Sequence, residues 1–188
     1  MNLRSPFRVG IKPKDNAQYV NDITVGETQL TVNNSIENAE DVQRIGIVVS
    51  LPLIDRTGLK LGDEVVVHHN VFRITWDDRG FPRQSDFHLI NDLFFVDDDL
   101  IYMIIREGKV VGYKDNVFVK PIKEVVPWEG EITIPNKGIV SFSNDELIKQ
   151  NVEQNQKVAI RKHTDYKFHI FGDTYYKMKN NRVLATLE

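Results

Sequence analysis

The segment KDNAQYVNDITVGETQLTVNNSIENAEDVQ, from Lys14 to Gln43, decides how this chain is divided. It separates two short runs that have the composition of buried strands, VGIKP at residues 9–13 and RIGIVVSLP at residues 44–52. The segment is rich in Asn, Asp, Glu, Gln and Thr, so it is too polar for a core and too long for an ordinary connection between strands. Long loops of this kind usually carry function. We therefore predict a mobile loop that orders on a partner.

Two apolar islands interrupt this loop, Ile23-Thr24-Val25 and Leu30-Thr31-Val32, with Gly26 between them. An inert linker does not need such islands, so one interpretation makes them the residues that bind the partner. The alternative is a β-hairpin that turns across Gly26 and Glu27 and packs on the rest of the protein. The sequence leaves both interpretations open.

Short apolar runs continue to the end of the chain and are separated by turn signals such as Gly62-Asp63 and Asp78-Arg79-Gly80. No long stretch has helical periodicity, and only residues 145–149 suggest a single helical turn. Many short strands with regularly spaced turns are typical of all-β barrels and sandwiches. We predict an all-β protein.

The apolar runs recur in the same order along the chain, which indicates an internal duplication. Five pairs of segments match: VGIKP (9–13) with VFVKP (117–121), RIGIVVS (44–50) with NKGIVSF (136–142), LKLGDEVVV (59–67) with VEQNQKVAI (152–160), NDLFFV (91–96) with GDTYYKM (172–178), and residues 100–105 with 183–187. The first copy is longer, chiefly in the Lys14–Gln43 loop. We predict two tandem β-barrels, residues 1–111 and 112–188, with the mobile loop 14–43 in the first.

These landmarks resemble the co-chaperonin family (GroES, 10 kDa chaperonin). The family pattern corresponds here to the strand end Ile11-Lys12-Pro13, the Lys14–Gln43 loop, Gly46-Ile47-Val48, the turn Leu61-Gly62-Asp63-Glu64-Val65 and the closing run Val183-Leu184-Ala185. The chain is about twice the usual length for the family. Its tandem form resembles the co-chaperonin-like proteins of tailed bacteriophages. In the second copy, Asn155-Gln156 stands where the family has its Gly-Asp turn.

The resemblance implies two GroES-like barrels in a homo-oligomeric ring that caps a GroEL-type chaperonin and assists ATP-dependent protein folding. It also implies that the chaperonin-binding residues belong to the apolar islands. They would be Ile23, Val25, Gly26, Leu30, Thr31 and Val32 in the first copy, and Ile132 and Ile134 in the second. The family motif follows a glycine, which favours Leu30-Thr31-Val32 as the anchor. The alternative function is a structural or adaptor protein, such as a virion component, built on the same duplicated barrels.

Composition limits the other possible functions. The chain has 188 residues, 41% of them hydrophobic, and a net charge of −3, so we expect no general nucleic-acid partner. The absence of Cys excludes disulfides, a thiolate zinc site and a cysteine nucleophile. No apolar run has the length of a signal peptide or a membrane span, so we expect no membrane association and a cytoplasmic location, in the bacterial host if the chain is viral.

Three smaller groups of residues invite a chemical interpretation. His68 and His69 suggest a metal site, but adjacent strand residues point to opposite faces, so we predict structural histidines. The run Asp97-Asp98-Asp99 lacks the spacing of a calcium loop, and we predict a solvated turn. Aromatic and basic residues near Trp76 resemble a nucleic-acid surface, but Asp77 and Asp78 oppose that interpretation. Since no catalytic or nucleotide-binding motif is present, we expect no enzyme, no metal and no cofactor.

Overall fold

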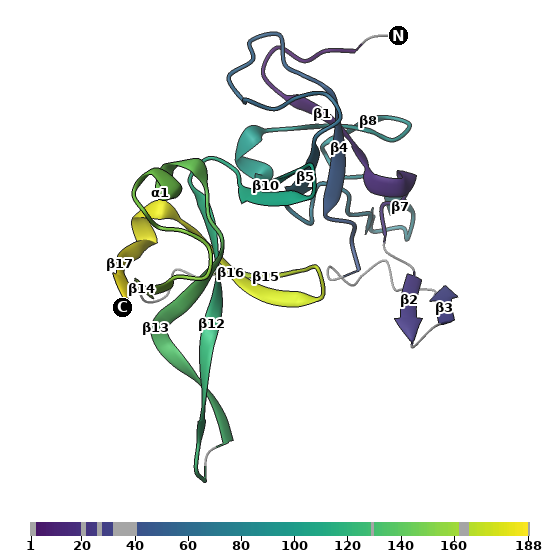
Figure 1. Ribbon diagram of the computed structural model, residues 1–188. Helices are drawn as coiled ribbons and strands as arrows, with labels where there is room; N and C mark the ends of the chain where they lie inside the picture. The colour runs from purple at the N-terminus through teal and green to yellow at the C-terminus, as the bar shows by residue number, and fades with distance from the viewer. Residues whose placement is uncertain are drawn as a thin grey trace. The chain divides into compact units, whose positions relative to one another are not determined.

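The computed structural model describes residues 3–19, 22–25, 28–31, 41–128, 130–161 and 166–187. These residues form seventeen strands, one short α-helix and three short 3-10 helices, so the predicted all-β class is confirmed (Figure 1). The chain divides into two compact units, residues 1–106 and 107–188. The division falls between β10 (Ile101–Arg106) and β11 (Lys109–Gly112).

The first unit is built on six antiparallel strands that pair in the order β10-β5-β4-β1-β9-β8. Their bounds are β1 Val9–Pro13, β4 Ile45–Ser50, β5 Glu64–Val67, β8 His88–Ile90, β9 Leu93–Val96 and β10 Ile101–Arg106. Two small hairpins accompany this sheet: β2 (Asp22–Val25) with β3 (Thr28–Thr31), and β6 (Thr75–Trp76) with β7 (Pro82–Arg83). The 3-10 helices are η1 (Lys14–Asn16) and η2 (Asp98–Leu100).

The core of the first unit is formed by apolar side chains at alternate positions along the strands. In β9 the residues Phe94 and Val96 are buried, while their neighbours in the strand are half-buried. The ring of Phe72 meets the ring of Phe94 edge to face, with centroids 4.9 Å apart at 88°. Each fully buried side chain of this size contributes about 1.5–3 kcal/mol of hydrophobic free energy.

The second unit pairs its strands in the order β15-β16-β12-β13-β14-β17. The bounds are β11 Lys109–Gly112, β12 Asn116–Val126, β13 Gly130–Phe142, α1 Asp145–Lys149, β14 Lys157–Ile160, β15 Tyr166–Ile170, β16 Asp173–Lys179, η3 Asn180–Arg182 and β17 Val183–Leu187. The predicted helical turn at residues 145–149 is confirmed. It is capped by the side chain of Asn144, which accepts hydrogen bonds from the backbone N–H of Glu146 and Leu147.

The two units repeat one strand order and one register. Pro13 of β1 stands opposite Gly46 of β4, and Pro121 of β12 stands opposite Gly138 of β13. The register shift that precedes Ile11 in β1 recurs before Val119 in β12. The segments matched in sequence at residues 9–13, 44–50 and 59–67 therefore lie at equivalent positions in the sheet to their partners in the second unit.

The turn that enters the third strand is also repeated. In the first unit, Gly62 has a φ of +87°, and its N–H donates to the carbonyl of Val48 at 2.8 Å. In the second unit, Asn155 has a φ of +70°, and its N–H donates to the carbonyl of Val140 at 2.7 Å. Asn is the side chain that best tolerates this left-handed backbone after Gly, so Asn155-Gln156 preserves the turn despite the change of sequence.

Closed barrels were predicted, and the pairing of the described strands does not close them. Closure requires end strands long enough to pair with the correct stagger. In the first unit, β8 has three residues and its register with β9 is irregular. In the second unit, α1 and the turn after it add Leu147 and Val152 to the core, so apolar surface is buried without pairing of the end strands. Both sheets are therefore open.

None of the helices in the described part of the chain is long and apolar enough to cross a membrane.

Candidate functional site: two inserted hairpins

The two ends of the segment between β1 and β4 are held together by backbone pairing. The N–H of Gln43 donates to the carbonyl of Gln18 at 2.8 Å, and Tyr19 and Val42 form a β-bridge. The hydroxyl of Tyr19 accepts a hydrogen bond from the N–H of Ile74 at 2.9 Å. Val42 is buried, with 2% of its surface exposed. Both ends of the long segment are thus fixed to the unit that carries it.

Between these two ends of the segment, the two apolar islands pair with each other. Strands β2 and β3 are antiparallel, with Ile23 opposite Leu30 and Val25 opposite Thr28. These pairs are alternate positions of one ladder, and Thr24 pairs with Gln29 at the position between them. The pairing satisfies the peptide groups of these strands. Mobility of the Lys14–Gln43 loop and its ordering on a partner stay predictions.

Three further residues of this segment, Thr31, Gly26 and Val32, were predicted to bind the chaperonin. Thr31 is the last residue of β3 and pairs with Asp22. Gly26 and Val32 lie outside the described residues. The hairpin across Gly26 and Glu27, which was the alternative interpretation, agrees with the observed strand pairing. Packing of that hairpin on the rest of the protein stays a prediction.

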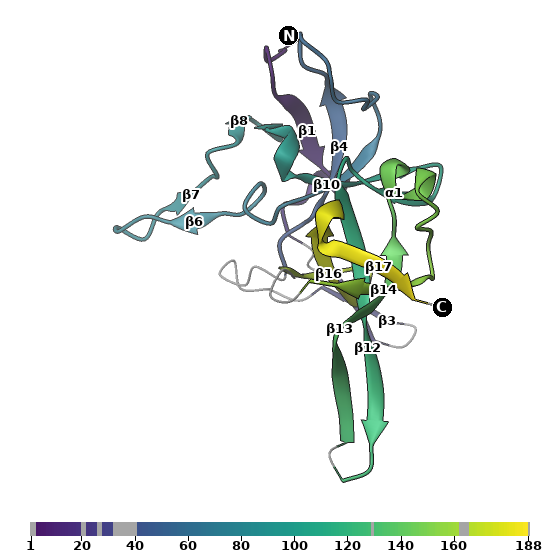
Figure 2. The same ribbon diagram turned by 90° about the vertical axis from the view of Figure 1, so that its left-hand side faces the viewer.

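The second unit also carries a hairpin between the two equivalent strands. Strand β12 continues beyond Pro121, and β13 begins early at Gly130, so the two strands pair past the sheet as a ribbon (Figures 1 and 2). The outer pairs are Lys123 with Thr133, Glu124 with Ile132, Val125 with Glu131, and Val126 with Gly130. We call residues 122–134 the arm. The arm occupies the position in the second unit that the long segment occupies in the first.

The arm contains the two binding residues predicted for the second copy. Ile132 and Ile134 are half-buried residues of β13, and they lie in a strand rather than in a loop. They lie in a strand because β12 supplies pairing partners from Lys123 onward, across a local hairpin turn.

Sequence reasoning missed the most exposed side chain of the arm. Trp128 is fully exposed (103%), and Val125 is 80% exposed. The backbone of Trp128 has a φ of +82°, a region that bulky side chains rarely adopt. A signal was present in the sequence, because Pro127-Trp128-Glu129-Gly130 places an aromatic residue inside a turn, where small polar residues are usual.

The histidine pair differs from its prediction. The rings of His68 and His69 stack with centroids 4.1 Å apart. They lie beyond the end of β5 at Val67, so strand alternation does not apply and the expectation of opposite faces is wrong. Burial, and to a smaller extent the positive charges of His68, Arg44 and Arg73, lower the pKa of His69 to about 4. Within the described ranges, no group of three or more His, Cys, Asp or Glu residues is placed to hold a metal ion.

Two of the acidic residues singled out above, Asp97 and Asp77, make different contacts. Asp97 accepts a hydrogen bond from Nε of Arg8 at 3.0 Å, in an exposed ion pair. Asp77 closes the turn between β6 and β7, because its Oδ1 accepts from the N–H of Arg79 and of Phe81, each at 2.9 Å. Neither carboxylate is arranged as a cation ligand in these contacts.

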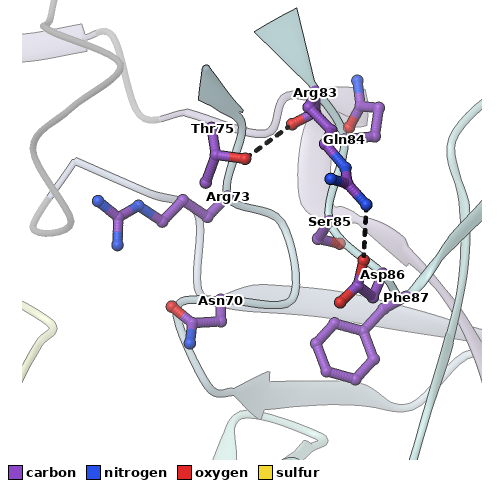
Figure 3. Close-up of a pocket in the computed structure, with 8 residues that line it drawn as sticks. All are labelled: Asn70, Arg73, Thr75, Arg83, Gln84, Ser85, Asp86 and Phe87. Atoms are coloured by element: carbon purple, nitrogen blue, oxygen red, sulfur yellow. Dashed lines mark hydrogen bonds and ion pairs between the residues drawn. The ribbon is translucent and has the colours of Figure 1, made fainter. Parts of the chain in front are cut away.

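An open hollow of about 510 Å³ lies at the base of the β6–β7 hairpin. Its lining residues are Asn70, Arg73, Thr75, Arg83, Gln84, Ser85, Asp86 and Phe87. Figure 3 shows Arg83 directed at Asp86, at 3.8 Å, and Arg73 directed away from this pair. Because the Arg83 charge is already balanced by a carboxylate, the hollow has a mixed polar lining and lacks the concentrated positive charge of a phosphate site.

No protein-family model matches this sequence, and no curated protein matches it.

Proposed function

We propose that this chain is a co-chaperonin: two tandem GroES-like domains that assemble as a homo-oligomeric ring and cap a GroEL-type chaperonin during ATP-dependent protein folding. The observation that carries the proposal is the repeated register, with a hairpin inserted in each unit between the same two strands. In the first unit, that hairpin pairs the two aliphatic islands that the family resemblance assigns to chaperonin binding.

The energetics of the β2–β3 hairpin suit reversible capping. Burying two aliphatic side chains such as Ile23 and Leu30 contributes about 3–6 kcal/mol. Ordering a residue costs about 1–2 kcal/mol, so a loop that orders entirely on binding gains little. Paired strands reduce that cost because fewer residues have to be fixed. One hairpin then binds weakly, and several hairpins on one ring bind firmly through their effective concentration.

The open sheets support assembly of several copies. In the second unit the sheet ends at β17, where residues 184–186 are exposed and Leu184 is 58% exposed. An end strand of this kind can pair with, or pack against, a second copy. Ring formation would place several hairpins on one assembly, as the capping function requires.

The test is the refolding of a denatured client protein that needs a capped chaperonin. A bacterial GroEL-type chaperonin with ATP is supplied with and without this chain, and the yield of active client is measured. The proposal predicts a higher yield with the chain, and no effect of the chain when the chaperonin is omitted. An unchanged yield would contradict the proposal and favour the structural or adaptor alternative.

A further inference from the structure

Basic side chains gather in the first unit at the place where β5 ends. The carbonyl of Arg44 accepts a hydrogen bond from the N–H of Val67, the last residue of β5, at 2.8 Å, so Arg44 lies beside the start of the histidine pair. A turn follows the pair, because the N–H of Val71 donates to the carbonyl of His68 at 3.0 Å, and the turn leads to Arg73. We call four half-buried side chains the basic cluster: Arg44, His68, His69 and Arg73.

The ring of His68 is held in place as a hydrogen-bond donor. Its Nδ1 accepts a hydrogen bond from the N–H of Asn70 at 3.1 Å, so the neutral ring carries its proton on Nε2. The ring of His69 stacks on one side, with centroids 4.1 Å apart, and the ring of Tyr102 meets His68 edge to face at 6.1 Å. These contacts orient an imidazole N–H within the basic cluster.

The charges that act on His69 are all positive. Burial is the largest cause of its low pKa, and the charges of His68, Arg44 and Arg73 add to the effect. No carboxylate in the described part of the chain is among the groups that shift this pKa. Like charges in half-buried surroundings repel one another, and a bound anion would reduce that repulsion. The basic cluster therefore favours a small anion.

Arg73 provides an independent indication of an anion. Its Nε is buried and has no hydrogen-bond partner among the described residues. A buried N–H of a charged group costs free energy when it makes no hydrogen bond, and such groups usually have a partner. Figure 3 shows Arg73 directed away from Arg83 and Asp86, so this carboxylate is not its partner. An oxyanion would accept two parallel hydrogen bonds from the guanidinium of Arg73.

We propose that the basic cluster binds a phosphate group, supplied by inorganic phosphate or by a nucleotide. A phosphate group offers more oxygens and more negative charge than a carboxylate, so it suits a site with several cationic and N–H donors. Arg73 would contact one edge of the group, and the imidazole N–H groups would contact its other oxygens. The inference goes beyond the proposed function, because this binding needs no chaperonin.

The first test follows the titration of the His69 ring by NMR in the full-length chain, with His69→Gln assigning its signal. Sodium sulfate is compared with sodium chloride at equal ionic strength. Sulfate serves as the probe because it keeps its charge as the solution is acidified, whereas phosphate gains a proton. We expect sulfate to raise the pKa of His69 by about one unit or more, because the anion offsets the positive charges around the ring. Equal pKa values in the two salts would overturn the proposal.

The second test measures the affinity for inorganic phosphate by calorimetry, in Arg73→Gln and in Arg83→Gln. Arg83 is the matched control, because it lines the same hollow and is paired with Asp86. We expect Arg73→Gln to weaken binding about tenfold or more, and Arg83→Gln to weaken it less than about twofold. Circular dichroism establishes that each variant is folded. Unchanged affinity in folded Arg73→Gln, or equal losses in both variants, would overturn the proposal.

A parallel titration with ADP distinguishes the two sources of the phosphate group. Tighter binding of ADP than of inorganic phosphate, with the same loss in Arg73→Gln, supports a nucleotide as the ligand. Weaker binding of ADP supports inorganic phosphate.

Discussion

Gly46 and Gly138 occupy the same position in their two sheets, each opposite the proline at which the inserted segment begins. A Cβ at Gly46 would lie 3.1 Å from Cδ1 of Ile11 and 3.2 Å from the carbonyl oxygen of Lys12. A Cβ at Gly138 would meet the equivalent atoms, colliding with Cγ1 of Val119 and lying 2.9 Å from the carbonyl oxygen of Lys120. Both units thus bring two backbones together at this point, and the second does so more closely.

Alanine at Gly138 should destabilise the protein more than alanine at Gly46. We expect Gly138→Ala to lower the free energy of unfolding by about 1–3 kcal/mol, because Val119 is fully buried and cannot move away freely. Gly46→Ala should cost about 1 kcal/mol or less, because a shift of a few tenths of an ångström relieves its contacts. Urea unfolding of both variants measures the difference. Equal losses would show that the two units are not packed differently here.

Asp63 joins the turn before β5 to the end of β10. Its Oδ2 accepts from the N–H of Lys60 at 2.8 Å, and its carboxylate forms an ion pair with Arg106, whose Nε donates to Oδ1 at 2.9 Å. Asp63 is 6% exposed. The hydrogen bond from Arg106 holds the pKa of Asp63 below its ordinary value, and burial opposes this effect only in part.

Asp63→Asn should lower the free energy of unfolding at neutral pH by about 1–2 kcal/mol, because the amide cannot form the ion pair. Since the folded-state pKa is lowered, the contribution of Asp63 is complete above the ordinary carboxyl pKa and is lost as the pH falls through the folded value. Asp97→Asn removes the exposed pair with Arg8, with both partners 48% exposed, and should cost less than about 0.5 kcal/mol. Chemical denaturation from pH 7 downward measures both variants, and equal effects would contradict this account.

His69 should make the first unit sensitive to mild acid. Its folded-state pKa of about 4 lies below the ordinary value of 6.5, so the unfolded chain binds the proton first as the pH falls. The contribution of neutral His69 to the free energy of unfolding is therefore fully present above pH 6.5. It is lost between pH 6.5 and 4, which lowers the free energy of unfolding by about 1–3 kcal/mol. We expect His69→Gln to flatten this part of the pH profile. A profile that His69→Gln does not alter would assign the pH dependence elsewhere.

The β2–β3 register provides a matched pair of variants for the docking surface. Ile23→Asp with Leu30→Asp introduces two charges at one cross-strand pair, and Thr24→Asp with Gln29→Asp introduces two at the neighbouring pair. We expect the first double variant to lose chaperonin binding by at least a hundredfold, because two charged groups would have to be desolvated in an apolar groove. The second should bind within about threefold of the wild-type chain. Sedimentation with ADP measures both, and equal losses would show that charge alone, on either face, abolishes docking.

Much of the sheet could be predicted from local pattern. The segments VGIKP and VFVKP match in composition, as do RIGIVVS and NKGIVSF, and Pro13, Gly46, Pro121 and Gly138 fall at equivalent register positions. Such positions are constrained by close backbone approach and by burial, so the same residue types stand there in both units. The turn at Asn155 could be identified for the same reason, since few residues adopt its backbone conformation.

The hairpins could not be predicted in the same way. Pairing of Ile23 with Leu30 was only one of two interpretations, because a four-residue strand in a polar segment has a weak local preference. The arm was not predicted, because its two strands form by pairing with each other. In addition, exposed residues such as Lys123 and Val125 show no alternation of apolar and polar types. The stacking of His68 on His69 depended on where β5 ends, and strand boundaries are the least predictable feature of a sequence.

Nucleotide-dependent binding to a chaperonin is the decisive test of the proposed co-chaperonin function. The wild-type chain is mixed with a bacterial GroEL-type chaperonin, and the co-sedimenting fraction is measured with ATP, with ADP and without nucleotide. We expect a stable complex with ATP or ADP and little binding without nucleotide. Failure to form a complex under any of these conditions, or equal binding with and without nucleotide, would contradict it.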